Sequence, residues 1–268
     1  MNNNQKAEIG IFGGSGFYSF LEKVEEYDVY TPYGSPSDKI TVGLVEGRKV
    51  AFMPRHGKDH SLPPHRINYR ANIFAMKMLG VKCIFGPCVS GSLQPHIKPG
   101  HFVVCDQFVD RTKGRIDTFY DGPKTIHLAM AEPYCPELRR IVIESAKELN
   151  IDYHPEGTVV VIQGPRFSTR SESRWYSSQG WEVINMTQYP EAYLAREQEM
   201  CYVNISLITD YDAGLEGHPE IKPVTIEEVI RVSNENNKKL TALLLKAILK
   251  IPEERDCACL HALKDAEI

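Results

Sequence analysis

The stretch CYVNISLITDYDAG, residues 201–214, decides how the fold is read from the sequence. Up to Thr209 the residues are mostly apolar or β-branched, a composition that is typical of a buried strand. The run then ends on two carboxylates, Asp210 and Asp212, which flank a tyrosine. Acids at the carboxyl end of a buried strand lie where α/β folds bind ligands, so one of them is a candidate proton donor or hydrogen-bonding group. Capping of the following turn is the alternative role.

Strand-like and helix-like segments alternate before and after this stretch. Strands are expected within 8–17, 82–93, 101–110, 156–169 and 180–187, and a hairpin within 38–57. Helices are expected within 66–80, 136–150, 172–179, 189–200 and 225–250. This alternation predicts one α/β domain over 1–268 with a largely parallel sheet, and 1–8 and 253–268 are expected to be flexible or tail segments.

Composition narrows the class of protein. Hydrophobic residues make up 42% and charged residues 25% of the 268 residues, which predicts a globular chain with a sizeable core. The net charge of −4 disfavours a nucleic-acid or anionic-membrane partner, but it allows a local basic pocket for a small anion. There is no apolar run of about 18 residues and no signal-peptide pattern at the start. We therefore expect a cytoplasmic protein.

The chain has seven cysteines, an odd number, so at least one is unpaired within the chain. Without an export signal we expect mostly buried thiols, although intracellular disulfides are common in hyperthermophiles. A bridge within Cys257-Ala-Cys259 would close a tight, strained ring that is readily reduced. Which of Cys135, Cys201, Cys257 and Cys259 are oxidised, and which of them pair, stays open at this point.

The loop GGSG, residues 13–16, follows the first expected strand. Its backbone N–H groups and the Ser15 hydroxyl are suited to an anion, and an ordinary tight turn is the alternative. The pattern is neither the Rossmann fingerprint nor a P-loop.

The loop PRHGKDHSLPPHR, residues 54–66, is rich in basic side chains. Arg55 and His56 at a strand end are typical of a phosphate clamp, because a forked guanidinium matches phosphate oxygens. A solvated basic loop is the alternative. Zinc binding by His56 and His60 would require both on one helical turn, which Gly57 disfavours, so we expect no metal. In INMT, residues 184–187, Met186 taken alone is expected in the core.

Taken together, these motifs resemble those of the 5′-methylthioadenosine phosphorylases, which are trimeric-type purine nucleoside phosphorylases. The resemblance extends over nearly the whole chain and rests on strings in the family's order and spacing: IGIFGGSGFY, TPYGSPSD, RHGKDH, NYRAN, SGSL, DQFVDRT, FYDG, MAEPYCP, GPRFSTRSES, INMT and TDYD. It implies a single α/β domain around a mixed, partly barrel-like sheet flanked by helices.

The resemblance also implies an activity. The family cleaves 5′-deoxy-5′-methylthioadenosine reversibly with inorganic phosphate, giving adenine and 5-methylthioribose 1-phosphate, in methionine and purine salvage. Phosphate is a co-substrate, and neither a metal nor an organic cofactor is needed. A homotrimer or dimer of trimers is implied, because a neighbouring subunit completes each active site.

Matching positions carry over the phosphate ligands. They are Ser15, Arg55, His56 and Thr187, together with Cys88 and Val89 where the family usually has a threonine-alanine pair. A thiol is a weak donor, so contact at Cys88 is expected to rest on the backbone N–H.

The nucleoside contacts carry over in the same way. Met186 is expected beneath the ribose, where its backbone helps to hold the hydroxyls, and Asp210 and Asp212 are expected to face adenine. Phe167 is expected near the base and Ser168 at a position linked to purine choice. The methylthio pocket is assigned to Ile226, Val229 and His127.

Asp210 is the expected general acid, because a carboxylic acid near N7 can protonate the departing base. A semi-buried position beside Asp212 is expected to raise its pKa. An aspartate favours adenine, whereas 6-oxopurine phosphorylases usually have asparagine at this position. Some activity on adenosine is expected, since apolar pockets reject an added hydroxyl only modestly. A 6-oxopurine phosphorylase, a hydrolytic nucleosidase and a non-catalytic nucleoside-binding protein are the alternatives.

Overall fold

The structure is a computed structural model that describes residues 6–13, 21–215, 217–264 and 266–267. The strands are β1 Ile9–Gly13, β2 Glu22–Tyr27, β3 Ile40–Val45, β4 Arg48–Pro54, β5 Cys83–Ser92, β6 Phe102–Val103, β7 Gln107–Arg111, β8 Tyr153–His154, β9 Thr158–Ile162, β10 Val183–Asn185 and β11 Cys201–Asp210. The α-helices are α1 Tyr69–Met78, α2 Pro136–Glu148, α3 Arg170–Ser178, α4 Gln188–Glu197 and α5 Ile226–Lys250.

All described strands belong to one 11-stranded sheet that branches at β5. Its main path runs β2-β3-β4-β1-β5-β10-β9-β7, and β11 pairs with β5 away from this path and continues into β6 and β8. β5 is parallel to β1 and β11 but antiparallel to β10. The expectation of a mixed α/β fold is confirmed. The sheet is less uniformly parallel than the alternation of elements suggested, because hairpins and the β10 and β6 pairings run antiparallel.

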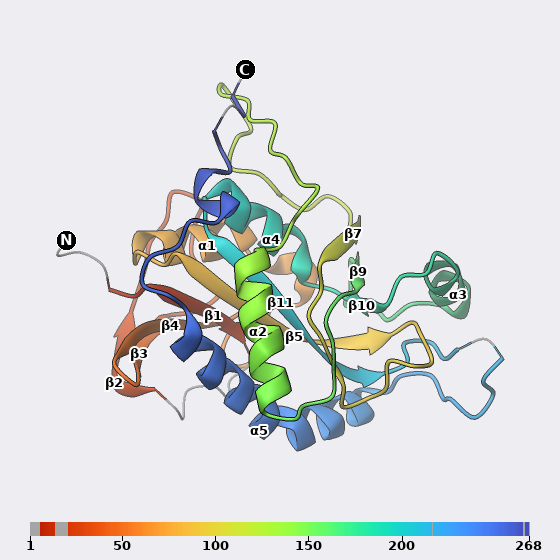
Figure 1. The fold of residues 1–268 in the computed structure, drawn as a ribbon. Coiled ribbons are helices and arrows are strands. Elements are labelled where there is room, and N and C mark those ends of the chain that lie inside the picture. The colour runs from red at the N-terminus through yellow and green to blue at the C-terminus, as the bar shows by residue number, and fades with distance from the viewer. Residues whose placement is uncertain (1–5, 14–20, 216, 265, 268) are drawn as a thin grey trace.

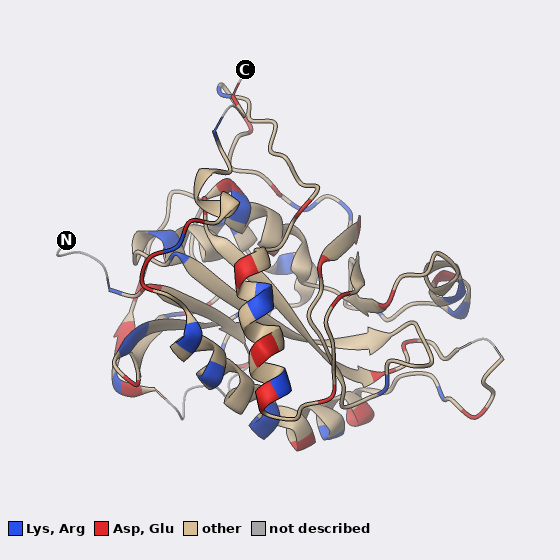
Figure 2. Cartoon of the chain, viewed as in Figure 1, with Lys and Arg blue, Asp and Glu red and all other residues tan. Residues whose placement is uncertain are grey.

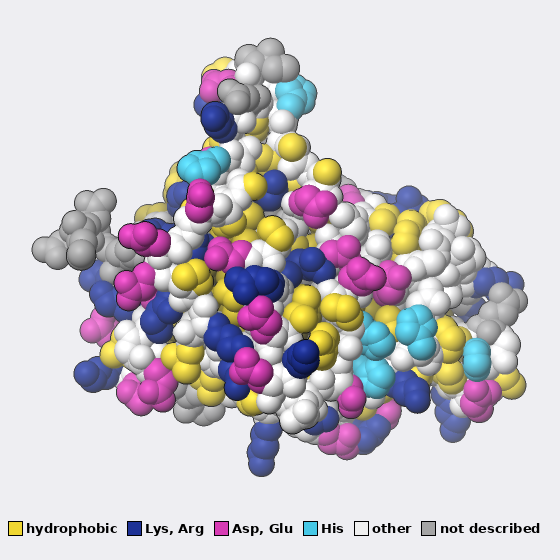
Figure 3. Space-filling model, viewed as in Figure 1, with side chains coloured by type: hydrophobic (Ala, Val, Ile, Leu, Met, Phe, Trp, Pro, Cys, Tyr) yellow, Lys and Arg dark blue, Asp and Glu magenta, His cyan; other side chains and the backbone are white. Residues whose placement is uncertain are grey.

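Helices cover both faces of the sheet (Figure 1). α2 and α5 pack on one face through a core that includes Leu138, Leu243 and Ile248, and α1 and α4 pack on the other around Ile73 and Leu194. None of the buried residues of α2 and α5 is charged, and the charged positions along both helices are coloured in Figure 2. On the face shown in Figure 3, basic and acidic side chains are interspersed rather than separated by sign. Among the described residues, no helix combines the length and apolar character needed to cross a membrane.

The hairpin between β3 and β4 turns where the sequence indicated. Glu46 and Gly47 have φ values of 46° and 83°. Two successive residues in the left-handed region are characteristic of the type I′ turn that joins twisted strands.

The expected single strand in 101–110 is two strands. β6 pairs with β11 and β8, whereas β7 pairs with β9. The chain changes its partner across this break, since Val104 N donates to His154 O and Asp106 N donates to Gly157 O. Segment 82–93 is a longer strand than expected, because β5 continues through the small residues as far as Ser92.

Parts of both terminal segments contact the core. Ala7 is fully buried, and a 3₁₀ helix at Ala258–His261 buries Cys259. Further on, Glu267 forms a bridge with Ile126. These residues show where the two segments contact the rest of the chain, and the expectation that 1–8 and 253–268 are flexible or tail segments stays a prediction.

Candidate active site

The carboxyl end of β11 places Asp210 beside β5 and β10. The β11 register shifts between Ile208 and Asp210, and Asp210 is aligned with Gly91 of β5. A Cβ on Gly91 would lie 2.9 Å from Asp210 Oδ1 and 3.1 Å from Ile184 Cγ2. The irregularity and the glycine together let the carboxylate lie over the strand ends, which is the expected ligand-binding edge.

Asp210 is a buried carboxyl with an altered pKa. It is 8% exposed, and it accepts hydrogen bonds from Thr209 Oγ1 and Asp212 N, both at 2.7 Å. Burial raises the pKa of Asp210 to about 6, aided by the negative charges of Asp212 and Glu228 and opposed by the two hydrogen bonds. A carboxyl of this kind exchanges its proton close to neutral pH, as a general acid requires.

Asp212 is 3% exposed and has a φ of 50°. Burial raises the pKa of its carboxyl, and the nearby hydroxyls of Ser173 and Ser168 oppose that shift. Within the described part of the chain, Asp212 Oδ2 and Ser168 Oγ are both buried without a hydrogen-bond partner. The two groups are close enough for the Ser168 hydroxyl to lower the pKa of Asp212, and because buried polar atoms are nearly always paired, either a polar ligand or a small rotation toward each other would satisfy them.

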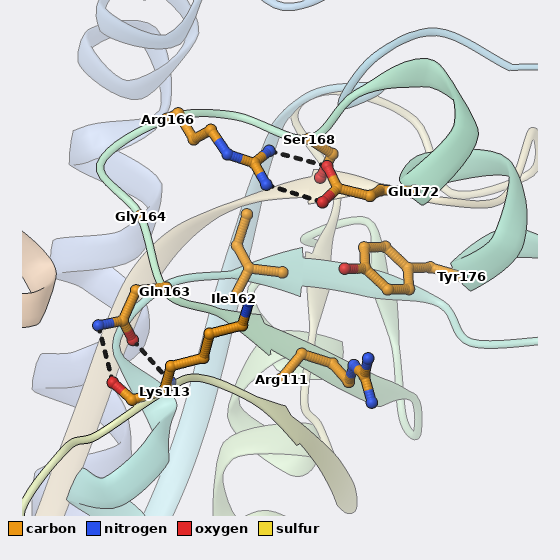
Figure 4. Close-up of a pocket in the computed structure, with 9 residues that line it drawn as sticks. All are labelled: Arg111, Lys113, Ile162, Gln163, Gly164, Arg166, Ser168, Glu172 and Tyr176. Carbon is orange, nitrogen blue, oxygen red and sulfur yellow. Dashed lines mark hydrogen bonds and ion pairs between the residues drawn. The ribbon is translucent and has the colours of Figure 1, made fainter.

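Ser168 also lines a pocket between β7, β9 and α3 (Figure 4). The other lining residues are Arg111, Lys113, Ile162, Gln163, Gly164, Arg166, Glu172 and Tyr176. Arg166 is held by Glu172 through two hydrogen bonds of 2.8 and 2.7 Å, which neutralise part of this basic wall. Phe167 lies between two lining residues and is 40% exposed, so its ring is accessible to a ligand.

Arg55 is buried, so the alternative of a solvated basic loop does not hold for this residue. Its guanidinium is 3% exposed and forms a two-point ion pair with Glu191, with distances of 2.6 and 2.8 Å. Tyr202 donates to the same carboxylate at 2.5 Å. Nη1 donates one of its two N–H groups to Pro87 O at 3.1 Å. The charge of Arg55 is therefore matched within the protein, and a phosphate role stays a prediction that involves the edge of the guanidinium away from Glu191.

His56 is a neutral side chain in this arrangement. Its Nδ1 lies 2.8 Å from Leu62 O and donates to it, which leaves Nε2 as an acceptor. Burial lowers the pKa of His56 to about 4, and the charge of Arg55 adds to this effect. The imidazole can therefore accept a hydrogen bond from a protonated phosphate oxygen but does not supply a cation. His60 stacks on it with ring centroids 4.4 Å apart.

Cys88 takes part in a side-chain network that the sequence did not indicate. Its Sγ accepts from Asn185 Nδ2 at 3.1 Å and from Asn204 Nδ2 at 3.4 Å. The thiol is thus engaged with amides, which leaves the backbone as the part of Cys88 and Val89 suited to an anion. Thr187 is the buried N-cap of α4, and its hydroxyl makes no capping hydrogen bond. Because Tyr189 interrupts the first turn with φ −112° and ψ 132°, an anion contact at Thr187 would come from its free hydroxyl and not from a regular helix end.

Met186 is fixed by residues that sequence reasoning missed. Arg115 Nη2 donates to Met186 O and to Gln163 O, both at 3.0 Å. Gly164 has a φ of 63°, and a Cβ there would lie 2.5 Å from Met186 Sδ. Neither Arg115 nor Glu191 has a local signature, since each reads as an ordinary charged residue in a polar segment. Ser15 lies outside the described residues.

The start of α5 lies beside the two acids. Val224 N donates to Asp212 O at 2.7 Å, and the Glu228 carboxylate acts on the pKa of Asp210. Ile226 and Val229 therefore begin a helix close to the candidate base site; Ile226 is exposed and Val229 is half-buried.

His127 is not brought to the other candidates within one chain. It is exposed, and its backbone N donates to Ala266 O at 2.8 Å. The segment around it projects with the C-terminal residues at the top of Figure 1, whereas α3 and the end of β11 lie at the right. The structure thus gathers the acids, Ser168, Met186 and the start of α5, and leaves this histidine apart.

Comparisons with known proteins show the family to which the chain belongs. The family model described as the phosphorylase superfamily matches residues 8–250. The S-methyl-5′-thioadenosine phosphorylase of Thermofilum pendens is 53% identical over 98% of this chain and 100% of its own. The purine nucleoside phosphorylase of Streptomyces coelicolor is 49% identical over 98% of this chain and 96% of its own.

Solved structures give the same result. A methylthioadenosine phosphorylase from Schistosoma mansoni in complex with adenine has a TM-score of 0.90 and 37% identity, with 97% of each chain covered. The chain belongs to the phosphorylase superfamily, among the S-methyl-5′-thioadenosine phosphorylases.

Proposed function

We propose that the protein cleaves the N-glycosidic bond of 5′-deoxy-5′-methylthioadenosine with inorganic phosphate, releasing adenine and 5-methylthioribose 1-phosphate in a reversible reaction. Family membership supports the reaction class. The observation that carries the proposal is the pair of buried acids at the end of β11, where Asp210 has a pKa raised to about 6 and Asp212 has an unpartnered oxygen.

The chemistry follows from this pair. Protonated Asp210 donates its proton to N7 of the departing adenine while the bond from C1′ to N9 breaks, and the ribosyl centre gains oxocarbenium character. A phosphate oxygen then forms the new bond at C1′. The proton that phosphate releases when it forms the ester returns Asp210 to its acid form through solvent. Because burial favours the neutral carboxyl, the proton is available where the leaving group needs it.

Adenine is recognised by the two buried atoms without partners, Asp212 Oδ2 and Ser168 Oγ. Asp212 Oδ2 accepts from the 6-amino group, and the Ser168 hydroxyl supplies a further hydrogen bond at the same edge. A 6-oxopurine would place a carbonyl oxygen against the Asp212 oxygen, which is an unpaired contact between two acceptors. Discrimination by a missing buried hydrogen bond is much stronger than discrimination by an apolar wall.

Phosphate is proposed to bind beside Thr187, where the chain leaves β10 and enters α4. Thr187, His56 Nε2, the backbone of Cys88 and Val89, and Ser15 are assigned to it, with Arg55 contributing the edge of its guanidinium that faces away from Glu191. Arg115 acts as a positioning residue, because it holds the carbonyl of Met186 beneath the proposed ribose site.

His127 is proposed to complete the site of a neighbouring subunit, in a homotrimer or dimer of trimers. It lies on a projecting segment of its own chain, where it cannot reach Ile226 and Val229 at the proposed methylthio pocket without a large movement (Figure 1). We also propose a cytoplasmic location, since all seven cysteines are free thiols, as suits a reducing compartment.

The test is adenine release from methylthioadenosine with and without phosphate, in parallel with inosine. Phosphate-dependent release, with inosine at least 10²-fold slower, is expected if Asp212 rejects the 6-oxo group. Phosphate-independent release would identify a hydrolase, and no turnover would favour a binding protein. Faster turnover of inosine would favour the second candidate, a 6-oxopurine phosphorylase, which the Streptomyces relative's name keeps in view.

A further inference from the structure

The proposed phosphate site is built from two separate segments of the chain. Cys88 and Val89 lie within β5, whereas Thr187 follows β10 and begins the turn into α4. The antiparallel pairing of β5 with β10 extends as far as Gly91 on one strand and Ile184 on the other. A phosphate held by both segments therefore depends on the contacts that fix their spacing beyond this pairing.

Asn185, the last residue of β10, makes such a contact. It is 6% exposed, and its Nδ2 donates to Cys88 Sγ at 3.1 Å. Its Oδ1 accepts from the backbone N–H groups of Thr187 and Gln188, both at 3.4 Å. The opposite orientation of the amide would place its NH₂ group against two further N–H donors, so these contacts fix which end faces the sulfur. One buried side chain thus links the two segments.

A closed ring of hydrogen bonds commits the Cys88 thiol to the interior of the protein. Cys88 Sγ lies 3.6 Å from Ser90 Oγ, which donates to Ser206 Oγ at 3.0 Å. Ser206 Oγ donates to Asn204 Oδ1 at 2.9 Å, and Asn204 Nδ2 donates back to Cys88 Sγ at 3.4 Å. Because both hydroxyl protons are used in this direction, the S–H proton faces Ser90. The sulfur is therefore an acceptor for Asn185 and not a donor to phosphate.

We propose that Asn185 is a positioning residue for phosphate. It acts through its two neighbours, because it holds the backbone of Cys88 and the hydroxyl of Thr187 at the spacing that one anion requires. Both polar atoms of its own amide are used within the protein, and Thr187 makes no side-chain capping bond, so its hydroxyl is the group offered to the anion. The inference rests on the proposed function, since it takes the phosphate site from there. It assigns Asn185 to phosphate affinity and not to the base or to the proton transfer.

The test is Asn185→Ala in the full-length protein, with initial rates of methylthioadenosine cleavage measured over a range of phosphate concentrations. The KM for phosphate should rise by at least about tenfold, because the two segments lose their common support. The kcat at saturating phosphate and the KM for methylthioadenosine should stay within about threefold of the wild-type values. Cys88→Ala removes the acceptor at the other end of the contact and should also raise the KM for phosphate. In the double variant the two increases should combine to less than their product, as expected for residues that act through one contact.

Asn236→Ala is the matched control. Asn236 is also 6% exposed, and its amide donates to Val232 O at 3.0 Å within α5, away from β5 and β10. This variant should keep the wild-type KM for phosphate. Thermal unfolding shows which variants are folded, and if Asn185→Ala is not, the KM for phosphate of Cys88→Ala decides the question.

Two results would overturn the inference while the proposed function stands. One is an unchanged KM for phosphate in folded Asn185→Ala, or in Cys88→Ala where that variant decides. The other is a loss confined to kcat, or an equal rise in the KM for methylthioadenosine, which would indicate a general structural role. Wild-type protein that releases adenine without phosphate would instead refute the proposed function, and the inference with it.

Discussion

The two ends of β11 are both buried, but their polar groups differ in whether they have partners within the chain. At the carboxyl end, Asp212 Oδ2 and Ser168 Oγ have no partner among the described residues. At the amino end, the Cys201 thiol lies among three other thiols and receives a hydrogen bond from Arg255. The strand has 10 residues, so its ends are roughly 30 Å apart.

The comparison distinguishes two uses of burial. Burial of an unpartnered carboxylate lowers stability, and such a group persists where a ligand supplies the missing hydrogen bond. Burial of several mutually close thiols from separate parts of the chain brings those parts together at one point. β11 therefore connects the proposed active site at its carboxyl end to the cysteine cluster at its amino end.

The largest expected effect is that of Asp210→Asn at the carboxyl end. An amide cannot donate the proton that N7 receives, so kcat/KM for methylthioadenosine should fall by about 10²–10⁴-fold, with a relative gain for inosine. Steady-state rates on both nucleosides measure this, and thermal unfolding checks that the fold is intact. Unchanged turnover of methylthioadenosine would remove Asp210 from the mechanism.

Glu191→Gln should cause the next largest effect, this time on stability. It leaves the buried guanidinium of Arg55 without its counter-charge, so the free energy of unfolding should fall by about 3–5 kcal/mol. Urea denaturation measures the change. Glu172→Gln is the control, because the Arg166 it pairs with is exposed and its loss should be below about 1 kcal/mol. Equal losses in the two variants would contradict the assignment of Arg55 to a buried ion pair.

The pH dependence of catalysis should reflect the raised pKa of Asp210. The acid must be protonated to act, so kcat/KM should fall as pH rises through about 6, by about tenfold per pH unit at the steepest. Asp210→Asn should lack this limb while keeping any limb that comes from phosphate itself. Another group would be the acid if the kcat/KM of the wild-type protein did not fall between pH 6 and pH 7. The same would follow if the profile of Asp210→Asn showed an equal fall.

Sequence and structure agree best where a signal is local. The strand at 201–210, the turn at Glu46-Gly47 and the helix beginning at Pro136 each follow from residues within one short segment. The acids at the end of β11 were also evident, because polar residues interrupt an apolar run there.

Long-range partners were not evident. The pairing of Arg55 with Glu191 joins positions 136 residues apart, and no local pattern links them. The division of 101–110 into two strands likewise depends on which neighbours each half finds in the folded sheet. The sequence left the pairing of the four cysteines around Cys201 open, and only the fold shows that the tail brings them together at the start of β11.

The smallest expected effect links the two ends of the strand. Cys257→Ser/Cys259→Ser removes two of the four thiols that meet at the amino end of β11. Its effect on kcat/KM should stay within about twofold, since changes more than about 10 Å apart are usually independent. Its melting temperature should fall clearly, because the C-terminal segment loses its attachment. Kinetics at a temperature well below both transitions, beside calorimetry, separate these results. A large loss of kcat/KM in protein that is still folded would mean that the tail acts on the site, most directly through the segment that carries His127, and that the ends of β11 are coupled.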